Sequence, residues 1–184
     1  MAEIKFKQIE IPKENLIQNK TNKKWQEIRR ASNIFASLVL KMKEELVPGE
    51  MRDNYNELEE LCLCSDSIVL IVNMSLSVEL AFKAILEYQG NFKGVHKLDE
   101  LFLRLNERTK KLIIKYLNIN RYCWNEKYNS EQEFVDALKT INELYVKYRY
   151  FFDERYDLKH FNKDITLLFS LFDFLVIYIN YKMK

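Results

Sequence analysis

The hydrophobic positions along the chain recur mostly at three- and four-residue steps, which is the period of an α-helix. Between residues 25 and 46 these steps trace one helical face, which we expect to be buried, and Pro48 and Gly49 end the pattern. The hydrophobic residues of this stretch are Trp25, Ile28, Ile34, Phe35, Leu38, Val39, Met42 and Leu46.

A second helical region opens near Asn54 and becomes apolar on nearly every side between residues 67 and 86. A helix that is apolar all round belongs at the centre of a bundle. The β-branched residues at 68–72 would also suit a buried strand, but no second β-rich run exists to pair with it. We therefore expect a central helix, followed by a loop at Gly90 and Gly94.

Three further helices complete the pattern. One runs from Leu98 to Ile113 with a break around residues 106–109, and the next runs from Phe134 to Phe152. After a charged interval, the segment Ile165–Tyr181 forms the last. Because the connections are short, the sequence predicts an all-α, up-and-down antiparallel helical bundle. We expect a single domain at residues 23–184, preceded by a short N-terminal arm at residues 1–22.

Composition agrees with this fold and excludes several kinds of chemistry. The 184 residues include only 3 glycines and 2 prolines, and neither a G-x-x-x-x-G-K nor a G-x-G-x-x-G motif occurs. Conventional nucleoside-triphosphate hydrolysis and dinucleotide redox chemistry are thereby excluded. The only histidines, His96 and His160, lie far apart, and a Cys62/Cys64 pair offers at most half a zinc site. We expect no metal and no cofactor.

The cellular location follows from two further features. Three cysteines are too few for a disulfide scaffold, and charges interrupt the first 30 residues too often for a signal peptide. The apolar segment Ile165–Tyr181 is just shorter than a membrane span and has Asp173 at its centre, where a carboxylate is costly. We therefore expect a cytoplasmic protein, without a membrane span, whose last helix is a buried core helix.

The net charge is only +2, but basic residues are concentrated in two places, the first being residues 1–30 with eight basic and four acidic side chains. Residues 104–127 carry seven basic and two acidic side chains, which is typical either of a surface that binds a polyanion or of a solvated helix face. Our candidates for binding in this stretch are Arg104, Arg108, Lys111 and Arg121.

The stretch from Tyr145 to His160 interleaves aromatic and basic residues, a composition that can stack bases and grip phosphates. Its aromatic residues at helical spacing also fit a buried core face, so both interpretations stay open. The candidates for binding here are Lys147, Arg149, Tyr150 and Lys159.

Within this stretch, Arg155 precedes His160 by five positions. A histidine can move the 2′-hydroxyl proton of RNA while an arginine stabilises the charge on the phosphate, so the pair suits a metal-independent ribonuclease. On a continuous helix the two side chains lie about 140° apart. They can meet only if the chain leaves the helix between them or if two subunits each contribute one.

Three pieces of the chain resemble the HEPN (higher eukaryotes and prokaryotes nucleotide-binding) domain family over residues 25–181. They are the helix Leu76–Leu86 with its Glu79 and Lys83, the turn Gly94-Val-His96-Lys-Leu98, and Tyr148-Arg149-Tyr150. The resemblance implies an all-helical bundle, usually dimeric. Many members are toxin or antiphage ribonucleases with an Arg-x4-6-His motif, and others bind RNA or nucleotides without cutting.

By this resemblance Arg155 and His160 would be the catalytic pair. The chain departs from active members at Tyr156, where Asn, Asp or His is common, and at Asn162, where a tyrosine is expected. In a second alignment Arg149 takes the Arg-Tyr position of a subgroup not marked by the nuclease motif, and no nuclease pair remains. The resemblance also gives His96 a structural role, either capping the next helix or tying its loop to the bundle.

Two functions are therefore predicted. The first is a HEPN-like protein that binds RNA, a nucleotide or a partner protein such as an antitoxin, as a homodimer, in a toxin–antitoxin or phage-defence setting. The alternative is a metal-independent endoribonuclease whose Arg155 and His160 meet across the dimer. A third interpretation, a purely structural interaction module, would require a large exposed apolar patch.

Overall fold

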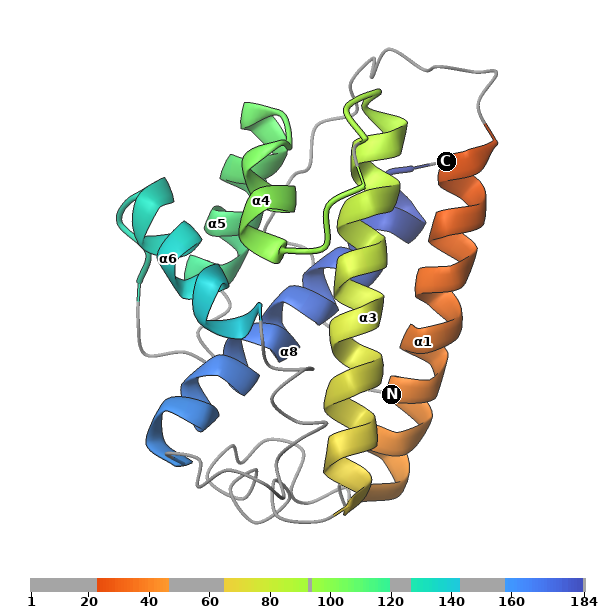
Figure 1. Ribbon diagram of the computed structural model, residues 1–184, viewed down its shortest axis with the longest axis vertical. Helices are drawn as coiled ribbons and strands as arrows, with labels where there is room; N and C mark the ends of the chain where they lie inside the picture. The colour runs from red at the N-terminus through yellow and green to blue at the C-terminus, as the bar shows by residue number, and fades with distance from the viewer. Residues whose placement is uncertain (1–22, 47–64, 93, 120–126, 143–157, 184) are drawn as a thin grey trace.

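The computed structural model describes residues 23–46, 65–92, 94–119, 127–142 and 158–183, and these residues form helices and short connections without any strand (Figure 1). The all-α prediction is confirmed for this part of the chain. The helices are α1 (Lys24–Leu46), α3 (Ser65–Tyr88), α4 (Leu98–Leu103), α5 (Glu107–Ile119), α6 (Glu131–Ile141) and α8 (Leu158–Tyr181).

Helix α3 stands at the centre, as its apolar composition predicts. It packs against α1, α4 and α8. In Figure 1, α1 lies on one side of α3, α4, α5 and α6 lie on the other, and α8 passes behind at a slant. Ala81, Phe82 and Ala84 of α3 are completely buried, so apolar side chains on several sides of this helix are removed from water.

Small polar residues let α1 and α3 approach closely. The Ser32 hydroxyl donates to the backbone carbonyl of Ser77 at 2.9 Å, and both serines are fully buried. At the end of α3, Lys24 lies 3.8 Å from the carboxylate of Glu87. The first turn of α1 therefore lies beside the last turn of α3, with Ser32 and Ser77 pairing further along both helices.

Helices α4, α5 and α6 join the core through aromatic side chains. The ring of Phe134 lies edge-on to Phe102 and to Tyr128, with centroid distances of 4.7 and 5.1 Å. On the α8 side, Tyr116 of α5 packs against Phe174 at 4.8 Å. These contacts fix α5 with one side toward α6 and α8, which leaves its other side to the solvent.

The break predicted in the third helical stretch is confirmed, with α4 ending at Leu103 and α5 beginning at Glu107. The side chain of Asn106 accepts a hydrogen bond from the backbone N–H of Thr109 at 2.8 Å, which caps the new helix. Before this, Gly90 adopts a positive φ of 75°, a conformation that favours glycine and lets the chain turn away after α3.

Two predictions about helix limits and faces are wrong. Helix α8 begins at Leu158 instead of Ile165, so the predicted charged interval partly belongs to the helix. On α1, Ile34 and Leu38 were expected in the buried face, but they are 64% and 46% exposed. Both lie on the side of α1 opposite Ser32, because α3 packs only against the face around Ser32, Ala36 and Val39.

Two of the described helices, over Ile68–Tyr88 and Asp164–Tyr181, are long and apolar enough to cross a membrane by length and composition. Most of each window is buried against the rest of the protein, 61% and 67% respectively, as in the core helices of soluble proteins. The predicted N-terminal arm at residues 1–22, and the part of the fourth predicted helix beyond residue 142, lie outside the described residues.

Candidate functional site

The solvent side of α5 carries a row of basic side chains. Arg108, Lys111 and Lys115 follow one another at steps of three and four residues, so they share one stripe of the helix, which we call the α5 basic stripe. Lys111 and Lys115 are exposed, and Arg108 is half-buried. Within the described part of the chain, neither Lys111 nor Lys115 forms an ion pair with an acidic side chain.

On another side of α5, Lys110 is buried and forms ion pairs. The side chain of Lys110 is only 8% exposed, and its ammonium lies 3.0 Å from Glu107 and 2.9 Å from Glu131 of α6. Burial disfavours the charged lysine, but the hydrogen bonds and charges of Glu131 and Glu107 outweigh burial and raise the pKa of Lys110 above 10.5. Lys110 thus joins α5 to α6 and is neutralised there.

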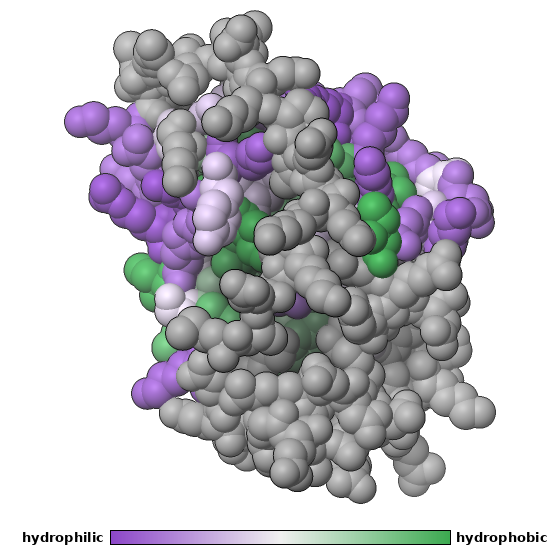
Figure 2. All heavy atoms as spheres, turned by 180° about the vertical axis from the view of Figure 1, so that it is seen from behind, coloured by the Kyte–Doolittle hydropathy of each residue, from purple (hydrophilic) through white to green (hydrophobic). Residues whose placement is uncertain are grey.

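The ion pair of Lys110 also involves the one acidic residue of α5. Glu107 is the only carboxylate of the helix, and it is bonded to Lys110. The stripe therefore carries three basic side chains against this one carboxylate, which is bonded to Lys110 and not to a member of the stripe. In Figure 2, hydrophilic side chains cover much of the upper surface on the side where Figure 1 places α4, α5 and α6.

Two of the three arginines predicted in this region, Arg104 and Arg108, are half-buried, whereas Lys111 is exposed. Arg104 follows α4 directly, and its backbone N–H bonds to the carbonyls of Leu101 and Phe102 as the C-cap of that helix. Arg108 lies near Tyr178 of α8. Burial raises the pKa of Tyr178, while the hydrogen bond between Tyr178 and Thr109 and the charge of Arg108 act in the opposite direction.

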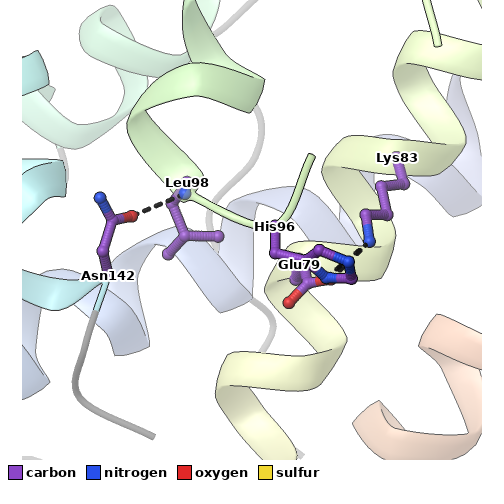
Figure 3. A network of polar contacts seen from close by, with 5 residues as sticks. All are labelled: Glu79, Lys83, His96, Leu98 and Asn142. Carbon is purple, nitrogen blue, oxygen red and sulfur yellow. Dashed lines mark hydrogen bonds and ion pairs between the residues drawn. The ribbon is translucent and has the colours of Figure 1, made fainter. Parts of the chain in front are cut away.

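A second polar cluster lies between α3 and the loop before α4 (Figure 3). The carboxylate of Glu79 accepts a hydrogen bond from the ammonium of Lys83 at 2.6 Å and lies 3.0 Å from Nδ1 of His96. Glu79 and Lys83 are only 12% and 11% exposed, whereas the His96 side chain is 74% exposed. Glu79 and Lys83 thus form a partly buried ion pair.

The geometry decides between the two structural roles predicted for His96. Its contact with Glu79 ties the loop to α3. The cap of α4 comes instead from Asn142 at the end of α6, whose side-chain oxygen accepts from the N–H of Leu98 at 2.6 Å (Figure 3). The amide of Asn142 also donates to Asp99 at 2.6 Å. The Asn142 side chain therefore fastens the end of α6 to the start of α4.

The chemistry of the two polar regions differs. An imidazole bonded to a carboxylate can exchange a proton with a ligand at the surface. However, Glu79 and Lys83 neutralise each other, so the cluster offers a polyanion little net charge. We assign it a structural role and take the α5 basic stripe as the candidate site.

Other predicted site residues lie outside the region whose side chains the structure describes. Arg121, Lys147, Arg149, Tyr150 and Arg155 fall in undescribed segments. Lys159 and His160 belong to the first turn of α8, but their side chains are not described. The catalytic pairing of Arg155 with His160 therefore stays a prediction.

Sequence reasoning overlooked one member of the stripe, Lys115. The sequence signal for Lys115 was present, because Lys115 lies seven residues after Arg108 and four after Lys111, the spacing of one helix face.

Among the side chains described in α1 to α8, no group of three or more histidines, cysteines or carboxylates could hold a metal ion.

Comparison of the chain with protein-family models, with curated proteins and with solved structures finds no match.

Proposed function

We propose that this chain is a HEPN-like RNA-binding protein, an antiparallel helical bundle that acts as a homodimer and binds the RNA backbone with the α5 basic stripe. The observation that carries the proposal is the pair of exposed lysines, Lys111 and Lys115, on a helix whose one carboxylate is bonded elsewhere. Basic side chains that no carboxylate neutralises attract phosphates and release the counterions that surround them.

The resemblance to the HEPN family supports RNA as the polyanion and a toxin–antitoxin or phage-defence setting as the context. The contacts between α1 and α3 support the antiparallel bundle, since Lys24 meets Glu87 while Ser32 meets Ser77. The polar cluster of Glu79, Lys83 and His96 falls on two of the three pieces that carry the resemblance, and there it holds a loop in place.

The test is the binding of a fluorescently labelled, mixed-sequence single-stranded RNA, measured by anisotropy over a range of salt concentrations. The wild type should bind, with an affinity that falls steeply as salt rises. The double variant Lys111→Glu/Lys115→Glu should bind at least roughly tenfold more weakly, because two attractive charges become repulsive.

A matched control is the double variant Lys97→Glu/Lys139→Glu, which changes the net charge by the same amount at exposed lysines away from the stripe. It should bind RNA almost as well as the wild type. Equal losses in both doubles would mean a response to net charge alone, and would contradict the proposed site.

The same RNA, end-labelled and incubated in EDTA, tests the ribonuclease alternative. Cutting that survives EDTA and disappears in His160→Ala would replace a binding function with metal-independent cleavage. A wild type that neither binds nor cuts RNA would overturn both.

A further inference from the structure

One aromatic side chain at the end of α8 extends into the solvent. Tyr181 is 70% exposed, more than any other large apolar side chain in the described part of the chain. The other tyrosines whose side chains are described are all buried, namely Tyr88, Tyr116, Tyr128 and Tyr178. A single exposed aromatic residue is ordinary by itself, so its meaning depends on what lies beside it.

The C-terminal end of α8 lies against the start of α5. The hydroxyl groups of Thr109 and Tyr178 are 3.3 Å apart, and Arg108 lies near the same tyrosine. Further along, Tyr116 of α5 packs against Phe174 of α8, so the two helices run antiparallel. Figure 1 accordingly shows the start of α5 and the end of α8 both in the upper half of the molecule. The first member of the α5 basic stripe is therefore at the same end of the bundle as the last turn of α8.

The same contacts place Tyr181 on the flank of α5 that carries the α5 basic stripe. Tyr181 follows Tyr178 by three residues, so its side chain is turned by about 60° from that of Tyr178 and lies about 4.5 Å further along α8. Because both helices are right-handed and antiparallel, this turn leads away from the side of α5 where Lys110 meets α6. Arg108 is on the same flank, about 160° around α5 from Lys110. The exposed ring therefore continues the row of basic side chains beyond the start of α5.

We propose that the α5 basic stripe binds single-stranded RNA, with one base of the strand stacked on the ring of Tyr181 while neighbouring phosphates meet the basic side chains. This inference rests on the proposed function and deepens it by naming the form of RNA that the stripe takes. Proteins that bind single strands combine basic side chains along the backbone with aromatic rings on which the bases stack. Only an unpaired base can turn out and lie flat on such a ring, whereas a duplex keeps its bases stacked on one another.

The two kinds of contact differ in their physical behaviour. Contacts between lysines and phosphates release counterions, so they weaken as salt rises. Stacking on an uncharged ring releases no counterion and therefore adds affinity without changing the salt dependence. Every base has a π-face, so stacking also carries little sequence preference. We therefore expect single strands of different sequence to bind with similar affinity, and a strand without bases to bind more weakly.

The experiment measures fluorescence anisotropy of the full chain with three labelled ligands of equal length. They are a mixed-sequence single-stranded RNA, the same strand paired with its complement, and an abasic strand that keeps the ribose-phosphate backbone. The wild type should bind the single strand about tenfold more tightly than the abasic strand, the effect of one stacked base. It should also bind the single strand more tightly than the duplex.

Three variants at one position separate stacking from other contacts. Tyr181→Ala and Tyr181→Leu should lower the affinity for the single strand about tenfold, to that for the abasic strand, and should leave the affinity for the duplex unchanged. Tyr181→Phe should bind like the wild type, because it keeps the ring and loses only the hydroxyl. None of the three should change the salt slope, since no charge is altered.

A matched control removes exposed apolar surface elsewhere. Ile34 of α1 is 64% exposed and lies on the other side of α3 from α5 (Figure 1), so Ile34→Ala should bind all three ligands like the wild type. Circular dichroism on each variant checks that the helix content is unchanged. The leucine and phenylalanine variants both keep a bulky side chain at the end of α8, so a difference between them reports the ring itself.

Three results overturn the inference: a single-strand affinity unchanged in Tyr181→Ala, an equal loss in Tyr181→Phe, or a wild type that binds the duplex or the abasic strand as tightly as the single strand. If RNA binding is still lost in Lys111→Glu/Lys115→Glu, the proposed function stands without the stacking contact. A wild type that binds none of the three ligands overturns the proposed function, and the inference with it.

Discussion

Lys110 and Lys111 are adjacent in the sequence, yet they lie on two sides of α5 with opposite roles. Lys110 is buried and held between two carboxylates, while Lys111 is exposed and has no acidic partner among the described residues. The 100° step between neighbouring residues of a helix separates them. The ammonium of Lys110, bonded to one carboxylate of α5 and one of α6, adds to the packing of the two helices, whereas that of Lys111 remains available to a ligand.

The largest expected effect comes from the core side of α5. Ile113 is fully buried, and Ile113→Ala should lower the free energy of unfolding by about 2–5 kcal/mol, because it leaves a cavity. Lys111→Ala on the other side should change it by no more than about 0.5 kcal/mol. Denaturant unfolding measures both. Similar losses for the two variants would contradict the division between the sides.

A second effect isolates the charges around Lys110. The double variant Glu107→Gln/Glu131→Gln removes both negative charges from a nearly buried ammonium and should cost about 1–3 kcal/mol. Adding Lys110→Met to that background should recover most of the loss, since no buried charge then lacks a counter-charge. Urea denaturation of the three chains measures this, and a triple variant no more stable than the double would count against the ion pairs.

The same group predicts a pH dependence. The pKa of Lys110 in the folded protein is raised above its ordinary 10.5, so its ion pairs contribute their full stability below that pH. The contribution is lost as the pH rises through the higher folded-state pKa. The stability difference between wild type and Lys110→Met should therefore drift in favour of Lys110→Met above pH 10.5. A difference that stays constant into strong alkali would rule this out.

The smallest effect sharpens the comparison on the solvent side. Lys115→Ala should reduce the slope of log affinity for RNA against log salt concentration by about 0.7, the value of one phosphate contact on a single strand. Lys110→Met should leave that slope unchanged, because its charge is already neutralised. Anisotropy titrations at several salt concentrations decide, and a slope that responds to Lys110→Met would place Lys110 at the RNA surface.

Much of the fold could be predicted because helical periodicity is a local property. The central position of α3, the stop after Leu46 and the break before α5 all follow from side chains within a few residues of each other. The start of α8 was missed because charged residues in a first turn resemble a loop in composition. Which hydrophobic residues of α1 are buried was also missed, since that depends on where α3 lies.

Part of the candidate site could likewise be predicted from the sequence, and part depended on contacts between helices. The excess of basic residues after Arg104 was visible in the sequence, but the difference between Lys110 and Lys111 was not. It depends on Glu131, a residue of α6 that the fold brings to α5. Likewise, the exposed His96 joins Glu79 across seventeen positions of sequence, and Asn142 caps a helix that begins at Leu98.

The sequence by itself determined that the described part of this protein is helical, where the first helix and the break before α5 lie, and that basic charge is concentrated around α5. Hydrogen bonding within a helix and the spacing of apolar residues are local properties, so they can be recognised in the amino-acid sequence alone. Tertiary structure alone decided which cations are neutralised and which apolar side chains of α1 remain in water. Those outcomes depend on contacts between helices distant in the chain, and only packing brings such partners together.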